Sequence, residues 1–134
     1  MFVFYSCHLH KSIPDFSNSK IVNGEYTSSE YTLVVYAAIG CGYSQAAIKK
    51  LQKFDGCKDF QLIVIENDSM ELINEHQKEY FTKATFYSNE EGKIKFKNFF
   101  PQYFLYKDGN LIWRKKGYVK EAKTILNAKM KCND

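Results

Sequence analysis

The sequence lacks the features that mark disordered, fibrous or membrane-spanning chains. Only two of its 134 residues are proline, whereas ten are tyrosine and eleven are phenylalanine, so long disordered tracts are not expected. No apolar run reaches the roughly 18 residues that a membrane-spanning helix needs. The length indicates one domain, which can bury a core without disulfide or metal staples.

The excess of positive over negative charge is also small. The net charge is only +4, and the lysines are spread along the chain, often beside acidic residues. The sequence has no dense basic stripe of the kind that follows nucleic acid. The charge therefore indicates solubility and no nucleic-acid partner, and we expect a monomer.

Cysteines are few and scattered. The spacings of the four match no zinc-binding pattern and give no disulfide scaffold: Cys7, Cys41, Cys57 and Cys132. The stretch Cys7-His8-Leu9-His10 holds three potential ligands for a soft metal, which is a weak signal on a terminal segment. We therefore expect one or two reactive thiols, no metal site and no cofactor.

The opening stretch, MFVFYSCHLHK, ends a short apolar run at Tyr-Ser-Cys and then turns polar. It is similar to the end of a bacterial lipoprotein signal, in which the cysteine becomes the lipidated first residue. A basic start is absent and the run is short, so an exposed or edge segment of a mature protein is an equal alternative. We assign residues 1–12 to an N-terminal arm, which a lipid could tether, and residues 13–134 to one domain.

The pattern of apolar residues predicts alternating strands and helices. Residues 31–38 (YTLVVYAA) and 60–66 (FQLIVIE) are continuous, β-branched and aromatic, as buried strands are. Apolar residues recur at helical spacing over 44–54, and a second helix is predicted over roughly 70–80 after the capping sequence Asn-Asp-Ser.

The C-terminal third predicts a hairpin at 101–117 and a helix at 118–131. Residues 8–30 are predicted to be an extended arm, in which Asn23-Gly24 favours a tight hairpin, and 81–100 give no clear element. Strand, helix and strand in that order imply a parallel crossover, and the hairpin adds antiparallel strands. The predicted fold class is α/β: a mixed central sheet with helices on both faces and an N-terminal extended arm or hairpin.

One stretch, YAAIGCGYSQAAIKKL at 36–51, places Cys41 at the hinge between a strand and a helix. A cysteine there meets unpaired backbone N–H groups and the positive end of the helix dipole. Both stabilise the thiolate, which is the attacking species in disulfide exchange. The alternative interpretation is a small buried residue at a strand end.

Ser44 stands three residues after Cys41, on the same helix face. Its hydroxyl can donate a hydrogen bond to a thiolate, but it cannot attack a mixed disulfide as a second thiol would. A capping role for Ser44, and its introduction in place of a natural cysteine, both stay open. Cys57 follows a helix of about a dozen residues, roughly 15–20 Å long, so it lies beyond disulfide reach of Cys41.

This order of elements, with Cys41-Gly42-Tyr43-Ser44 at the hinge and Pro101 opening the hairpin, resembles the thioredoxin fold over residues 31–130. The family carries a Cys-x-x-Cys motif at the first position and a cis-proline at the second. Asp108-Gly109 and Gly117 match its hairpin turn and the glycine that follows.

Two N-terminal stretches narrow the resemblance. IPDF at 13–16 and NGE at 23–25 are similar to the start of TlpA-like thioredoxins, in the superfamily of alkyl hydroperoxide reductases and thiol-specific antioxidants. These relatives are extracytoplasmic and often tethered to a membrane. The resemblance thus implies a periplasmic or cell-envelope location if the protein is bacterial, with the cytoplasm left open.

The chain departs from the family at three positions. Ser44 replaces the second cysteine, Ile39-Gly40 stands where a tryptophan usually precedes the nucleophile, and Val35 takes the place of a buried acid. No Pro or Thr precedes Cys41 at the spacing of the peroxiredoxin signature, which disfavours peroxide reduction.

The resemblance implies a thiol–disulfide oxidoreductase that acts through one thiol on protein or low-molecular-weight thiols and disulfides. Its implied catalytic residues are Cys41, Ser44 and Pro101, with Gly42, Tyr43 and Phe100 binding substrate. The backbone before the proline pairs with an extended substrate, and Phe99 and Ile39 complete an apolar rim. The alternative is a redox-silent binding module for a partner or an unfolded protein.

Overall fold

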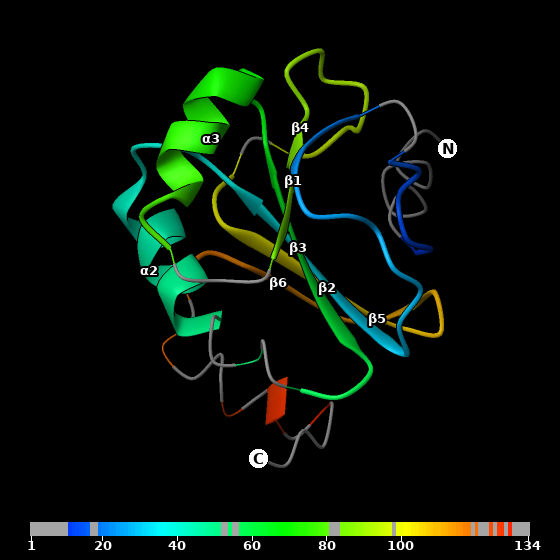
Figure 1. Cartoon of the computed structure of the whole chain (residues 1–134). Coiled ribbons are helices and arrows are strands. Elements are labelled where there is room, and N and C mark those ends of the chain that lie inside the picture. The colour runs from blue at the N-terminus through cyan, green and yellow to red at the C-terminus, as the bar shows by residue number, and fades with distance from the viewer. Residues whose placement is uncertain are drawn as a thin grey trace, which may run out of the picture.

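The computed structural model describes residues 11–16, 19–51, 54, 57–80, 84–97, 99–118, 120, 124, 126–127 and 129. The predicted arm up to residue 10, its metal-ligand candidates, and Cys132 lie outside these residues. The described strands and helices are β1 (Lys20–Asn23), β2 (Tyr31–Ala37), α2 (Gly42–Leu51), β3 (Phe60–Glu66), α3 (Met70–Gln77), β4 (Thr85–Ser88), β5 (Gln102–Lys107) and β6 (Asn110–Lys116), shown in Figure 1.

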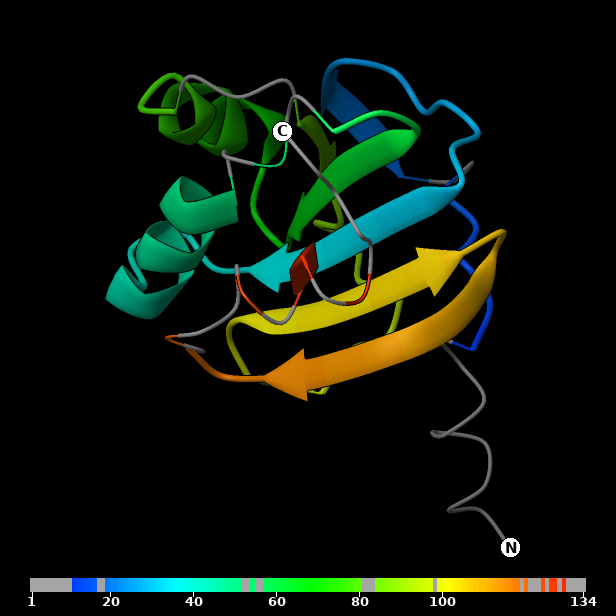
Figure 2. The same ribbon diagram turned by 90° about the horizontal axis from the view of Figure 1, so that it is seen from below.

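Six strands form one mixed sheet in the order β1-β4-β3-β2-β5-β6. Strand β3 runs parallel to β2 and to β4, whereas β1, β5 and β6 pair antiparallel with their neighbours. Helices α2 and α3 make the two parallel crossovers, as a strand–helix–strand order requires. Figure 2 shows the β5–β6 hairpin at one edge of the sheet, beside β2.

The predicted hairpin at Asn23-Gly24 is wrong. Strand β1 ends at Asn23 and pairs with β4, which follows much later in the chain. Gly24 has a φ of +82°, and a Cβ added there would lie 2.9 Å from the Thr85 hydroxyl oxygen. The glycine therefore allows a close approach to the neighbouring strand rather than a tight turn back.

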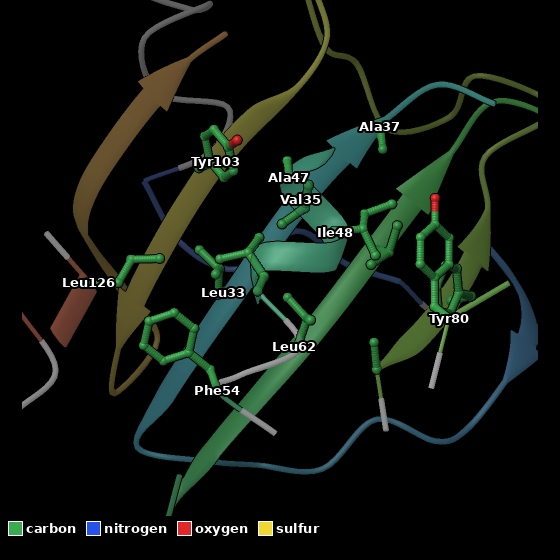
Figure 3. Packing of buried hydrophobic residues seen from close by; sticks show 14 of the residues in the cluster. Leu33, Val35, Ala37, Ala47, Ile48, Phe54, Leu62, Tyr80, Tyr103 and Leu126 are labelled. Atoms are coloured by element: carbon green, nitrogen blue, oxygen red, sulfur yellow. The ribbon is translucent and has the colours of Figure 1, made fainter. Parts of the chain in front are cut away.

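Side chains alternate across the sheet and form a core on each face. Leu33, Val35 and Ala37 of β2 pack under the helices, and Figure 3 shows Ala47 and Ile48 of α2 beside them. The same cluster includes Ile73 of α3 and Leu126, while the opposite cluster holds Phe16, Tyr36, Tyr87 and Phe104.

Helices on both faces were predicted, but α2 and α3 lie on the same face. The other face is covered by residues 13–16 and by the loop at 94–100, whose Phe96 ring stacks on Tyr36 at 4.1 Å. Four positions of the predicted helix at 118–131 are described as helical, Thr124, Leu126, Asn127 and Lys129, and most of the rest lie outside the described residues. No helix in the described part of the chain is long and apolar enough to span a membrane.

Candidate functional site

The chain turns sharply between β2 and α2, and Cys41 sits at that turn. Gly40 has a φ of +84°, and the Cys41 N–H donates back to the Ala38 carbonyl over 3.2 Å. The Cys41 carbonyl accepts the first helical hydrogen bond, from Gln45, over 3.0 Å. Because α2 begins at Gly42, Cys41 is the N-cap residue of the helix.

The N-cap position sets the ionisation of the Cys41 thiol. Cys41 is a free, partly exposed cysteine. Desolvation acts to raise the pKa of its thiol, but hydrogen bonds from the Ser44 hydroxyl and from the backbone N–H groups of Ser44 and Tyr43 outweigh it. The net effect is a Cys41 pKa below its ordinary value. These backbone donors are the unpaired N–H groups of the first helical turn, which the position of the cysteine at the hinge had suggested.

Ser44 links the thiol to the end of β2. Its side chain is fully buried, and its hydroxyl oxygen accepts a hydrogen bond from the Ala38 N–H over 3.1 Å. The hydroxyl proton is then available to Cys41, the second partner of the same group. Ser44 therefore orients the thiolate from a fixed position rather than capping the helix.

Pro101 lies beside the end of β2, because the next residue, Gln102, pairs with Tyr36. The Phe100–Pro101 peptide bond is cis, and the Pro101 carbonyl accepts a hydrogen bond from the Gly117 N–H over 2.7 Å. The buried Gln102 side chain donates to the carbonyls of Lys97, over 2.6 Å, and Phe99, over 2.9 Å. The side-chain amide of Gln102 thus holds the loop before Pro101 in place through two hydrogen bonds.

The predicted apolar rim is only partly exposed. Tyr43 and Phe99 are 66% and 50% exposed, whereas Ile39 and Phe100 pack against the two cores and are mostly structural. Sequence reasoning missed Tyr118, which is 37% exposed and whose ring centre lies 6.1 Å from that of Tyr43. The exposed rim (Tyr43, Phe99 and Tyr118) comes from three separate segments. The resemblance supplied Tyr43 and Phe99, whereas no local pattern places Tyr118 beside them.

A buried polar network at the end of β3 was also missed. The Glu66 carboxylate is fully buried, with its oxygens 3.1 and 3.4 Å from Nδ1 of His76. Nε2 of His76 lies 3.0 Å from the Tyr80 hydroxyl. The hydrogen bond to Glu66 is the main cause that raises the pKa of His76. The signal for this network was a charged residue that ends an apolar strand.

Two further observations concern the cysteines and the potential metal ligands among the described residues. Cys57 is in a disulfide and Cys41 is free, so these two cysteines are not joined to each other. No group of three or more His, Cys, Asp or Glu side chains that could hold a metal occurs in the part of the chain described here.

Solved structures of other proteins share this architecture. They include a thiol-disulfide isomerase from Corynebacterium glutamicum, with a TM-score of 0.63 and 12% identity over 86% of this chain and 92% of the other. A thioredoxin-like protein from Porphyromonas gingivalis matches at 0.64, with 14% identity and coverages of 84% and 86%. Peroxiredoxin Q from Xanthomonas campestris matches at 0.65, with 13% identity and coverages of 90% and 97%. The chain has the thioredoxin-like fold.

The similarity to solved structures establishes the fold but not the activity. No family model and no curated protein matches the sequence. The structural neighbours are named for isomerase and peroxiredoxin activities, so the fold alone does not choose between them. The residues around Cys41 must carry the functional argument.

Proposed function

We propose that the protein is a thiol–disulfide exchange protein that acts through the single nucleophilic thiol of Cys41. The observation that carries the proposal is the set of hydrogen-bond donors around this sulfur: the Ser44 hydroxyl and the backbone N–H groups of Tyr43 and Ser44. They favour the thiolate over the thiol, and the thiolate is the species that attacks a disulfide.

The proposed reaction is one exchange step. The Cys41 thiolate attacks one sulfur of a substrate disulfide, and a Cys41–substrate disulfide forms as the substrate S–S bond breaks. The departing sulfur leaves as a thiolate and takes a proton from water. Because Ser44 cannot attack the adduct, release requires a second thiol, from the substrate or from a low-molecular-weight compound. That thiol loses its proton to water and attacks the substrate sulfur of the adduct. A new disulfide forms between these two sulfurs, the Cys41–substrate S–S bond breaks, and Cys41 leaves as a thiolate.

Substrate binding is proposed at the surface between the start of α2 and Pro101. Gly42 and Tyr43 are exposed on the helix side, and Phe100 and Pro101 provide the backbone against which an extended segment would pair. The exposed rim fits an apolar side chain near the reacting cysteine. Protein disulfides are therefore the proposed substrates, with low-molecular-weight disulfides also accepted.

An oxidising compartment is the proposed location. Cys57 forms a disulfide, and structural disulfides persist mainly in extracytoplasmic compartments. A periplasmic or cell-envelope protein, with or without a lipid tether, fits this observation.

The proposed function is tested by the pH dependence of Cys41 alkylation. The protein is treated with iodoacetamide at a series of pH values, and peptide mass spectrometry quantifies the modification of Cys41 separately from other cysteines. We expect a midpoint below that of a cysteine in an unstructured peptide measured alongside. A midpoint equal to or above that of the peptide would overturn the proposal.

The second candidate function is a redox-silent binding module, which the exposed rim favours. Binding to a reduced, carboxymethylated protein, which is unfolded and has no free thiol, separates the two candidates. Equal binding by the wild type and Cys41→Ala, with no adduct to any disulfide, would favour the module. Adducts that form with disulfides and vanish in Cys41→Ala would favour exchange.

A further inference from the structure

We infer that the Cys41 site selects extended protein segments that carry acidic residues beside an aromatic or large apolar residue and the reacting cysteine. This inference rests on the proposed function and names its substrate class. It arises from a lysine frame (Lys50, Lys97, Lys116 and Lys120), in which Lys50 contacts the Tyr118 ring and the other three each stand two residues from Phe99 or Tyr118 in the sequence.

Two lysines of the frame lie in segments whose backbones contact Pro101 or the neighbouring Gln102. Lys116 precedes Gly117, which donates to the Pro101 carbonyl, and its own backbone pairs with Gln102. Lys97 supplies a carbonyl that accepts from the Gln102 side chain, in the loop that leads to Pro101. Both side chains are exposed. They therefore flank the backbone against which a substrate segment would pair.

The other two lysines, Lys50 and Lys120, lie on the Tyr118 side of the rim. The Lys50 ammonium lies 5.1 Å from the centre of the Tyr118 ring and donates to the Lys120 carbonyl over 2.8 Å. Lys120 itself is exposed. Because Tyr118 also contacts Tyr43, the positive charge and the aromatic surface form one continuous patch next to Cys41.

The frame lacks neutralising partners within the described residues. The ion pairs there join other groups: His76 to Glu66, Lys78 to Glu75, and Lys93 to Glu91. Most described acidic residues lie away from the frame: Glu30, Asp59 and Asp108 gather at the other end of β2 and β5, and Glu90 and Glu91 follow β4. Asp68, which follows β3, acts on Tyr36. The positive surface beside Cys41 is therefore available for acidic groups of a partner.

The frame acts on the substrate rather than on the sulfur. Desolvation and hydrogen bonds from Ser44 and Tyr43 set the pKa of Cys41, without a contribution from lysine. The effect of a frame lysine is therefore measured as a ratio of rates between charged peptides, in which the intrinsic reactivity of the Cys41 sulfur cancels. Attraction between the frame and an acidic segment raises the rate of encounter and falls as salt is added.

The test uses short peptides that share one phenylalanine and one cysteine activated as its uncharged 2-thiopyridyl disulfide. Three versions carry glutamate, glutamine or lysine on both sides, and release of pyridine-2-thione reports the reaction. At low salt we expect the glutamate peptide to react about tenfold faster than the lysine peptide. Salt of about 0.5 M should reduce the ratio to less than about threefold.

Variants assign the preference to the frame. Lys50→Gln and Lys116→Gln should each reduce the glutamate-to-lysine rate ratio by about two- to fourfold, as expected when one of several charges is lost. Lys107→Gln is the matched control, because Lys107 also lies over a tyrosine ring, 5.6 Å from that of Tyr31, at the far end of β5. It should keep the wild-type ratio. Tyr118→Ala should reduce the advantage of the phenylalanine over a serine in the peptide.

The uncharged reagent 2,2′-dithiodipyridine separates this inference from the proposed function. If Cys41 does not react with that reagent, the exchange function itself fails. If Cys41 reacts with the reagent but treats the three peptides alike, or if Lys107→Gln changes the ratio as much as Lys50→Gln, the inferred substrate class is wrong.

Discussion

The Ser44 hydroxyl oxygen accepts a hydrogen bond from the Ala38 N–H over 3.1 Å and stands next to the Cys41 sulfur. The end of β2 therefore fixes the orientation of a group that stabilises the thiolate. A cysteine at position 44 would complete the family motif, and the serine instead provides a stronger hydrogen-bond donor that has no redox chemistry. This relationship leads to two predictions about Ser44.

Ser44→Ala should raise the pKa of Cys41 toward its ordinary value, because the side-chain donor to the thiolate is lost. Leaving the Ala38 N–H unpaired should also cost about 1–3 kcal/mol of stability. Alkylation of Cys41 against pH and urea unfolding measure the two effects. The control is Ser69→Ala, which removes the N-cap of α3, where the Ser69 hydroxyl accepts from Leu72 over 3.3 Å. It should lower stability and leave the Cys41 pKa unchanged.

Ser44→Cys should convert the protein from one that accumulates mixed disulfides into one that turns over. The new thiol lies one helical turn from Cys41, so its attack on the adduct is intramolecular and gains a high effective concentration. Disulfide reduction with a recycling reductant, and intact mass after exposure to an oxidised thiol, measure the change. Efficient turnover by the Ser44 protein without any adduct would show that another cysteine resolves Cys41.

Gln102 should position the loop before Pro101 for substrate pairing. Gln102→Leu removes the donor to the Phe99 and Lys97 carbonyls, so the reaction with the peptide disulfides described above should slow by about tenfold. The reaction with 2,2′-dithiodipyridine and the pKa of Cys41 should stay as in the wild type. If both reagents slow together, the residue supports the whole site rather than peptide binding.

Gln61→Leu is the matched control for this loop effect. Gln61 is also a buried glutamine that holds a loop, through its donation to the Glu25 carbonyl over 2.9 Å, but it lies in a different part of the sheet. A similar loss of stability in both variants, with slow peptide reaction only in Gln102→Leu, would assign the effect to the loop before Pro101.

The sequence predicted the parts of the fold that are encoded locally. The strand at Phe60–Glu66, the hinge at Cys41 and the turn at Asp108-Gly109 follow from apolar runs and turn residues, and the structure has them. The strands β1 and β4 escaped prediction because each has only four residues and depends on pairing with strands distant in the sequence: β1 pairs with β4, and β4 also pairs with β3.

The candidate site likewise has a part that the sequence predicts and a part that it does not. Cys41 and Ser44 could be identified because they are neighbours in the sequence and share a helix turn. Tyr118 and the lysine frame could not be identified, because α2, the loop at 94–100 and the segment after β6 meet only in the folded protein. Glu66 and His76 likewise meet only when α3 packs against the sheet.

Stability should fall as pH rises through the raised pKa of His76. The charged imidazole is held by Glu66, so the folded-state pKa lies above the unfolded value of about 6.5. The stabilisation is therefore fully present below about pH 6.5 and is lost as pH rises through the folded-state pKa. Glu66 and His76 are both buried. Glu79 and Asp68 also raise the pKa of His76, so they act in the same direction as Glu66.

His76→Gln should remove this pH dependence and lower stability at pH 6 by about 3–5 kcal/mol, since the Glu66 carboxylate is left buried without its charged partner. Urea unfolding at pH values from 5.5 to 8.5 measures the free energy for both proteins, and their difference isolates the contribution of His76 from other titrating groups. The double variant Glu66→Gln with His76→Gln removes both charges and should recover part of the loss. A wild-type stability that rises relative to His76→Gln above pH 7 would mean that His76 is neutral in the folded protein and that its hydrogen bond with Glu66 does not depend on the imidazolium charge.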